Sequence, residues 1–213
     1  MTRTLTLVYL VAACLFDRPD PANAERLQAL LDELLRETPA DAPWHATLIR
    51  LAQHAGHVPE LETEHVRLFV LAVPRVAAQP YASYWLEEDH QLLGDSAQKM
   101  RAVMTAHGVE VSAGSGLLPD HIVSELEFIA YLAGSGEPHQ ETRRRLVAEH
   151  LARWTPLFTA ALRQARPSPR YRLASEFLDQ LVAWDLEQSA RTGGTPHISI
   201  TAASGEHAHD SIR

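Results

Sequence analysis

The sequence contains a single cysteine, Cys14, among 213 residues. One thiol cannot form an intrachain disulfide, and it cannot supply the four thiolates of a structural zinc site or of an iron–sulfur cluster. Hydrophobic residues make up 46% of the chain and the mean hydropathy is -0.17, as in soluble globular proteins. A chain of this length and composition must therefore be stabilised by one packed core.

Positive charge is also scarce: the sequence has 19 basic and 27 acidic residues, which gives a net charge of -8. This balance argues against a nucleic-acid-binding protein, which needs a basic surface. It favours a basic partner instead, and a basic peptide would suit it.

The most apolar segment lies at the N-terminus, where Arg3 is followed by an apolar run that reaches Cys14. The run has the outline of a secretory signal, and residues 11–14 fit a lipoprotein cleavage pattern, so an exported lipoprotein is one alternative. However, apolar residues at positions 5, 8, 12, 15 and 16 recur with helical spacing and continue beyond the cysteine. We therefore expect a buried first helix with Cys14 in the core.

Strand-like alternation is missing from all but residues 197–201. Apolar residues recur instead at helical spacing in residues 5–16, 25–37, 44–55, 60–71, 96–107, 122–132, 142–152 and 171–187. This pattern predicts an all-α, single-domain helical bundle of about eight to ten helices over residues 1–188. Residues 189–213 have little apolar periodicity, and we expect them to form a flexible C-terminal tail.

Familiar catalytic and nucleotide-binding motifs are absent as well. The sequence has neither G-x-x-x-x-G-K-[ST] nor G-x-G-x-x-G, and no serine lies in a G-x-S-x-G turn. His121 and Glu125 share one helical face at a spacing that metal sites use, but no local pattern supplies a third ligand. The run Arg143 to Arg145 could meet phosphate, although such a run more often forms a solvated face.

Two stretches stand out against this background. In the first, residues 80–86, a proline precedes Tyr81, Tyr84 and Trp85, a concentration of amphipathic aromatic surface that forms either core or a pocket wall. An acidic cluster at residues 87–89 follows directly.

The second stretch, residues 118–128, is a polar turn that leads into an amphipathic helix. Asp120 is placed to cap the helix that follows it, because a carboxylate there accepts otherwise unpaired backbone N–H groups. His121 would lie in the first turn, where the helix dipole disfavours a charged imidazole, and we expect a neutral ring. The pair is either a simple cap or part of a recognition site.

Three stretches together resemble the TorD/DmsD family of redox-enzyme maturation proteins, the cytoplasmic chaperones of molybdenum oxidoreductases. They are residues 64–69 (EHVRLF), residues 80–86 (PYASYWL) with 93–96 (LGDS), and residues 119–121 (PDH) with 125–128 (ELEF). Weaker similarity occurs at residues 150–156 and 9–16, so the likeness spans residues 9 to about 187 in the family's order. The chain departs from the family pattern after Phe69, where residues 70–74 replace a glycine- and proline-rich turn.

The resemblance implies an all-helical fold, no enzyme activity and no cofactor or metal. It implies cytoplasmic binding of a molybdoenzyme catalytic subunit and its twin-arginine leader peptide, with assistance to cofactor insertion and export proofreading. Molybdopterin-cofactor delivery proteins are possible further partners, nucleic acid is not, and the chain is a monomer or a domain-swapped dimer. The leader- and client-binding residues carried over by motif are Pro80, Tyr81, Ser83, Trp85, Asp120, His121 and Glu125. A nucleotide-binding or nucleotide-hydrolysing helical protein remains the alternative.

Overall fold

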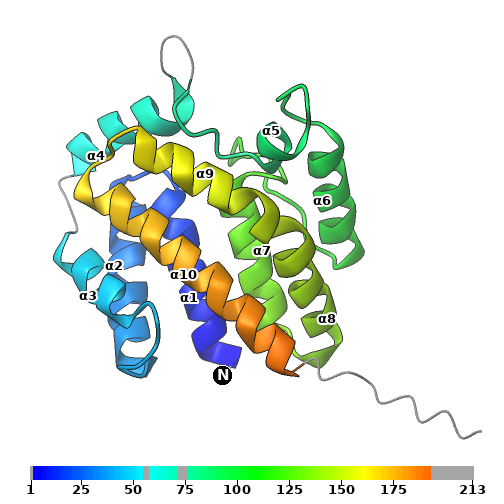
Figure 1. Cartoon of the computed structure of the whole chain (residues 1–213), viewed down its shortest axis with the longest axis horizontal. Coiled ribbons are helices and arrows are strands. Elements are labelled where there is room, and N and C mark those ends of the chain that lie inside the picture. The colour runs from blue at the N-terminus through cyan, green and yellow to red at the C-terminus, as the bar shows by residue number, and fades with distance from the viewer. Residues whose placement is uncertain (1, 55–57, 72–75, 193–213) are drawn as a thin grey trace, which may run out of the picture.

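The computed structural model describes residues 2–54, 58–71 and 76–192, and in these ranges the chain forms ten α-helices and no β-strand (Figure 1). The α-helices are α1 (Thr2–Phe16), α2 (Pro21–Glu37), α3 (His45–Gln53), α4 (Val58–His65), α5 (Ala82–Leu86), α6 (Asp95–Ala106), α7 (Ile122–Gly134), α8 (Glu137–Leu146), α9 (Ala152–Gln164) and α10 (Pro169–Thr192). Two π-helical turns, η1 (Val66–Val70) and η2 (Val147–Leu151), extend α4 and join α8 to α9. The predicted all-α architecture is confirmed. None of the described helices has the length and apolar character needed to cross a bilayer.

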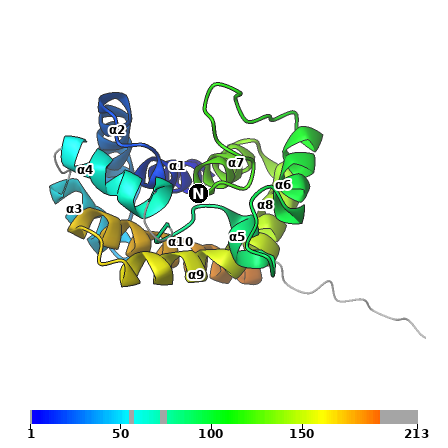
Figure 2. The same ribbon diagram turned by 90° about the horizontal axis from the view of Figure 1, so that it is seen from above.

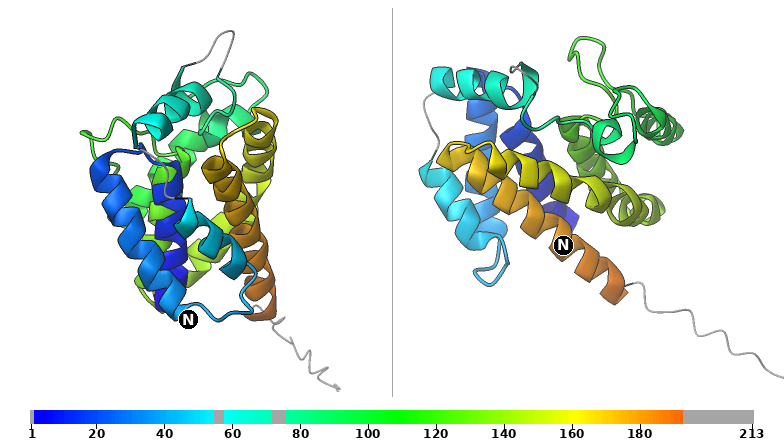
Figure 3. Two further views of the ribbon diagram at one scale, coloured as in Figure 1. Left: turned by 90° about the vertical axis from the view of Figure 1, so that its left-hand side faces the viewer. Right: turned by 45° about the horizontal axis from the view of Figure 1, so that its top comes forward.

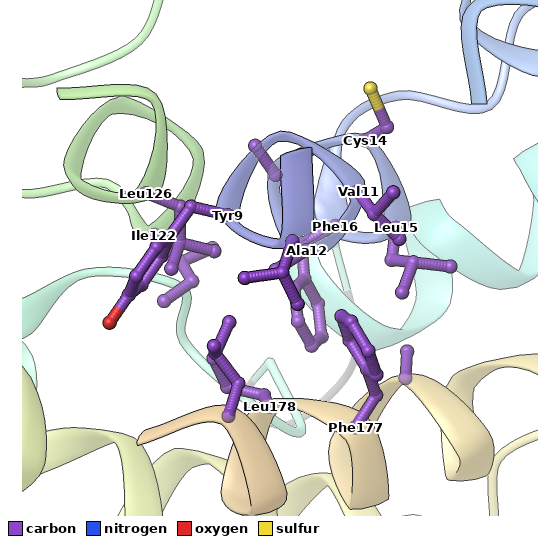
Figure 4. Close-up of a cluster of buried hydrophobic side chains, with 14 of the residues drawn as sticks. Tyr9, Val11, Ala12, Cys14, Leu15, Phe16, Ile122, Leu126, Phe177 and Leu178 are labelled. Atoms are coloured by element: carbon purple, nitrogen blue, oxygen red, sulfur yellow. The ribbon is translucent and has the colours of Figure 1, made fainter. Parts of the chain in front are cut away.

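Helix α1 is the centre of the fold. All but one of the residues from Val8 to Phe16 are at most 2% exposed, and a helix that is apolar on every side belongs inside a bundle. Figures 2 and 4 show α7 and α10 on two adjacent sides of α1. Tyr9 of α1 lies beside Leu126 of α7, and Leu178 of α10 lies on the other of these sides. The other helices are arranged around this apolar axis.

Cys14 is 1% exposed, and burial raises the pKa of its thiol to about 11. The predicted buried first helix and the buried cysteine are therefore confirmed. A mature lipoprotein would begin at Cys14, so its processing would remove residues 1–13 and with them most of the central helix. The fold thus argues against the lipoprotein alternative.

The helices around α1 bury their apolar faces as the sequence pattern predicts. On α2 the leucines at positions 27, 31 and 34 are buried, which is one face of the helix, whereas most residues of α7 are buried. A second, smaller cluster attaches α6 to the molecule and consists of Met100, Met104, Phe128, Leu132 and Leu146. Figure 2 accordingly shows α5, α6 and α8 together on one side of the central helices.

Several helix limits differ from the sequence prediction. The segment expected to be helical over residues 60–71 is α-helical only to His65 and continues as η1. The stretch expected to be helical over residues 142–152 is α-helical to Leu146 and continues as η2 into α9, which contains Pro156. The last helix continues to Thr192, so residues 189–192 of the expected tail are helical, while residues 193–213 lie outside the described residues.

Arg143 is the clearest correction to the predicted solvated face, because its side chain is only 7% exposed. Its guanidinium forms an ion pair with Asp185 of α10, which is 1% exposed, and Tyr9 of α1 donates a 2.6 Å hydrogen bond to the same carboxylate oxygen. Gln140 accepts a 2.9 Å hydrogen bond from Arg143 Nε. A buried charge needs such partners, and here they connect α1, α8 and α10.

Candidate functional site

The two stretches singled out in the sequence meet in the structure through an isolated antiparallel β-bridge between Tyr81 and His121. The Ile122 N–H donates to the Pro80 carbonyl at 2.8 Å, and the Ala82 N–H donates to the Asp120 carbonyl at 2.9 Å. The bridge joins the start of α5 to the start of α7. Residues that are distant in sequence therefore form one rigid unit at this end of the molecule.

Asp120 caps α5 across this bridge and does not cap the helix that follows it, so the predicted cap was assigned to the wrong helix. Its Oδ2 accepts hydrogen bonds from Ser83 N at 3.0 Å and from Ser83 Oγ at 2.6 Å, and both residues are 0% exposed. His121 is the N-cap of α7, because its Nδ1 accepts from the Val123 N–H at 3.2 Å. The local rule identified a capping residue but not the helix that it serves.

His121 is held neutral, as expected, but burial is the main cause. Burial, aided by the charge of His65, lowers the pKa of His121 to about 3, and the ring is 7% exposed. An acceptor role for Nδ1 requires the proton of the neutral ring to be on Nε2. The ring of Tyr81 meets the His121 ring edge-on with 5.0 Å between centroids, and burial raises the pKa of Tyr81.

The aromatic residues form the accessible part of the site, since Tyr81, Tyr84 and Trp85 are all half-buried. Trp85 Nε1 donates a 2.7 Å hydrogen bond to the Gln79 carbonyl, and the Tyr84 ring meets the Trp85 ring edge-on at 5.0 Å. His90 Nδ1 donates to the Tyr84 carbonyl at 2.6 Å. These bonds fix the orientation of an amphipathic surface that faces solvent.

Glu125 is fully buried one helical turn below His121 and points to other partners. Its carboxylate accepts from His150 Nε2 at 2.6 Å and from Trp154 Nε1 at 3.1 Å, which ties α7 to η2 and α9. Burial opposes the charge on His150, but the Glu125 carboxylate outweighs it and raises the pKa of His150. Glu125 and His121 are thus not brought together as ligands, and the described residues contain no group of three metal-binding side chains.

Of the acidic cluster that follows, Glu87 has a structural role. Its carboxylate accepts the Ser96 N–H at 2.9 Å and so caps the start of α6, whereas Glu88 and Asp89 are exposed. The carboxylate lies so close to Gly94 that a Cβ there would be 1.6 Å from Glu87 Oε2. A side chain at this glycine of the LGDS stretch would therefore displace the Glu87 carboxylate from its capping position.

The structure thus brings together six of the seven residues expected at the site, and Glu125 lies beneath them. Only Tyr81 and Trp85 are half-buried, whereas the other residues are buried and act as a frame: Pro80, Ser83, Asp120, His121 and Glu125. Sequence reasoning missed the Glu125 partners, although His150 and Trp154 belong to the weaker similar stretch. It gave no role to His65, although this residue belongs to the EHVRLF stretch; the Nδ1 of His65 lies 3.3 Å from the Tyr171 hydroxyl, within hydrogen-bond distance.

Comparisons with known protein sequences point to one family. A family model described as nitrate reductase delta subunit matches residues 18–160. The chaperone protein TorD of Vibrio cholerae serotype O1 (strain O395) is 31% identical over 146 residues, which cover 62% of this chain and 66% of TorD. The Tat proofreading chaperone DmsD of Salmonella typhi is 32% identical over 140 residues, or 64% of this chain and 65% of DmsD. The chain therefore spans just under two thirds of the length of these curated relatives.

A solved structure shares the fold. It is the crystal structure of an Archaeoglobus fulgidus protein assigned as a redox enzyme maturation protein, with a TM-score of 0.59, 21% sequence identity, and coverage of 86% of this chain and 93% of that one. At this identity the likeness bears on the fold alone. The sequence comparisons confirm the resemblance that the three stretches predict. Because the family model covers well over half of the chain and its relatives are TorD and DmsD proteins, the chain belongs to the nitrate reductase delta subunit (TorD/DmsD) family.

Proposed function

We propose that this protein is a cytoplasmic, system-specific chaperone of a molybdenum oxidoreductase. It binds the twin-arginine leader or the folding apo-form of the catalytic subunit, assists cofactor insertion and delays export until the subunit is loaded. The names of the chaperones TorD and DmsD support this function, which acts through binding and not through catalysis. The observation that carries the proposal is the bridge between Tyr81 and His121, because it unites the two most diagnostic stretches.

The residues of the site divide into a contact surface and a frame. A twin-arginine leader is basic at one end and apolar in its middle, so the half-buried rings of Tyr81 and Trp85 suit its apolar part. The exposed carboxylates of Glu88 and Asp89, on a chain with a net charge of -8, suit its arginines. The buried side chains of Asp120 and Ser83 hold the aromatic residues in place. Contact with a cofactor-delivery protein and the choice between monomer and domain-swapped dimer stay predictions.

The proposal is tested by calorimetric titration with a synthetic leader peptide. The peptide is taken from the large subunit that co-purifies with this protein from its native host. Replacing both aromatic residues (Tyr81→Ala, Trp85→Ala) weakens binding about tenfold or more, the effect of losing ~1.4 kcal/mol. The matched control is Tyr131→Ala, which removes a tyrosine on α7 that is 43% exposed. Unchanged affinity in the double variant, or an equal loss in the control, contradicts the proposal.

The frame is tested separately by Asp120→Asn combined with His121→Leu. This variant is expected to weaken leader binding while far-UV circular dichroism shows unchanged helicity. If the affinity stays unchanged while the free energy of unfolding falls by about 1 kcal/mol, Asp120 is only a cap.

A further inference from the structure

A cavity of about 400 Å³ lies between the first turn of α1, the loop from α2 to α3, and α10. It is lined by Thr4, Leu5, Glu37, Thr38, Pro39, Asp41, Ala42, Pro43, Trp44 and Trp184. Figures 1 and 3 show that the loop from α2 to α3 lies at the end of the molecule that holds the N-terminus, away from α5. The cavity is therefore separate from the proposed leader-binding surface.

The two ionisable residues that line this cavity are both acidic. Glu37 and Asp41 are its only ionisable lining residues, and Asp41 is exposed without an ion-pair partner among the described residues. Glu37 is paired with Arg3, whose Nε lies 3.0 Å from Glu37 Oε1. The C-terminal end of the 17-residue helix α2, where the helix dipole is negative, also reaches the cavity at Thr38. These features attract a cation.

The walls of the cavity are aromatic and rigid. The rings of Trp44 and Trp184 meet edge-on with 4.7 Å between centroids. Trp44 is only 2% exposed and supports Trp184, which is half-buried and presents surface to the cavity. Pro39 and Pro43 fix the loop on the other side. A half-exposed indole beside unpaired carboxylate charge is a favourable setting for a cation–π contact.

Thr38 adds a polar group at the back of the cavity. Its side chain lies at the C-cap of α2, it is 7% exposed, and its hydroxyl has no hydrogen-bond partner within the described part of the chain. Buried polar atoms in folded proteins are nearly always paired. The oxygen itself is inaccessible to solvent, so a donor in the cavity reaches it only if the Thr38 side chain rotates toward the cavity.

We propose that this cavity binds an arginine side chain of a partner polypeptide. A guanidinium is planar, so it stacks on the indole of Trp184 while its N–H groups reach the Asp41 carboxylate and the Thr38 hydroxyl. An ammonium group offers no flat face for the indole, and an uncharged side chain makes no use of the carboxylates. The site goes beyond leader binding and does not depend on it.

The test uses the full chain and the tripeptide N-acetyl-Gly-Arg-Gly-amide, with a citrulline tripeptide as its uncharged match. Binding is followed by the indole NMR signals, since Trp44 and Trp184 report on the cavity whereas Trp85 and Trp154 lie elsewhere. We expect saturable shifts of the Trp184 signal with the arginine peptide and none with citrulline. Asp41→Asn, followed through Trp184, and Trp184→Leu, followed through the Trp44 signal, should each weaken binding about two- to fivefold.

The matched control is Glu25→Gln, which removes an exposed carboxylate from the opposite end of α2. It leaves the affinity unchanged if the site is specific. The proposal is overturned if citrulline binds equally well, if Glu25→Gln weakens binding as much as Asp41→Asn, or if millimolar arginine peptide gives no saturable shift at Trp184. Leader titrations do not enter this test, so the two proposals can fail independently.

Discussion

The hydroxyl of Ser83 donates a 2.6 Å hydrogen bond to Oδ2 of Asp120, which lies 37 residues further along the chain. The Ser83 backbone N–H donates to the same oxygen at 3.0 Å, and both side chains are completely buried. The five-residue helix α5 is thus started by a carboxylate from another part of the chain. Because α5 carries Tyr84 and Trp85, the position of the aromatic surface depends on this contact.

Removing the Ser83 hydroxyl tests that dependence. Ser83→Ala leaves the backbone bond to Asp120 intact but deletes the shorter one, and we expect a loss of about 1–2 kcal/mol in the free energy of unfolding. Urea denaturation measures the loss. Ser124→Ala is the matched control, because this buried hydroxyl has no hydrogen-bond partner in the described chain and its removal should be nearly neutral. Equal effects of the two substitutions would show that the Asp120 contact adds nothing.

The pair of Glu125 and His150 predicts how stability depends on pH. The pKa of His150 is raised above 6.5 in the folded chain, because the Glu125 carboxylate outweighs the opposing effect of burial. A group that holds its proton more tightly when folded contributes fully below its unfolded pKa, and the contribution is lost as the pH rises through the folded pKa. The wild-type chain should therefore lose stability between neutral and mildly alkaline pH.

The measurement compares the Tm of the wild-type chain and of His150→Gln at about pH 6 and about pH 8.5. The advantage of the wild type should be larger at the lower pH. His54→Gln is the control, since His54 is exposed at the end of α3 and its ring bonds, within the described residues, only to the Arg50 carbonyl one turn earlier. A constant difference across this range would mean that His150 does not change its charge.

The helices could be predicted because apolar periodicity is a property of consecutive residues. The leucines at positions 27, 31 and 34 mark the buried face of α2 without any knowledge of what covers it. Capping could be predicted only in part. The sequence around Asp120 identifies it as a capping residue, but its hydrogen bond from the Ser83 N–H depends on a bridge between distant segments of the chain.

Burial of charge could not be predicted in the same way. Arg143 and Arg144 are neighbours with identical side chains, yet the exposed fractions of those side chains are 7% and 33%. The difference is set by Asp185, which lies 42 residues away. The site residues were found through similarity of motifs. That most of them frame the surface and only Tyr81 and Trp85 are partly exposed required the packed structure.

A side chain at Gly94 should lower stability through the Glu87 cap and not through the backbone, because the φ of -71° is open to any residue. A Cβ at this position would meet Glu87 Oε2 at 1.6 Å, so Gly94→Ala must displace the carboxylate that caps α6. We expect a loss of about 1–2 kcal/mol, the usual cost of losing a cap, measured by urea denaturation. In a Glu87→Ala background the same substitution should cost little. Gly114→Ala is the control, since its Cβ would meet only Ser112 Oγ at 3.7 Å; additive costs of Gly94→Ala and Glu87→Ala would contradict the steric account.

Arg143→Leu should be among the most damaging single substitutions in the chain. It leaves the carboxylate of Asp185, which is 1% exposed, with the Tyr9 hydroxyl but without a countercharge. Breaking a buried ion pair by removing one partner costs about 3–5 kcal/mol, because the remaining charge is desolvated and unpaired.

The control is Arg144→Leu, which removes the same kind of side chain from an exposed pair with Glu141 and should cost about 0.5 kcal/mol or less. Asp185→Asn combined with Arg143→Leu should recover part of the loss, since no net charge then stays buried. Urea denaturation of the wild type, Arg143→Leu, Asp185→Asn and the double variant gives the coupling free energy between Arg143 and Asp185. A value near zero would show that the two charges do not stabilise each other.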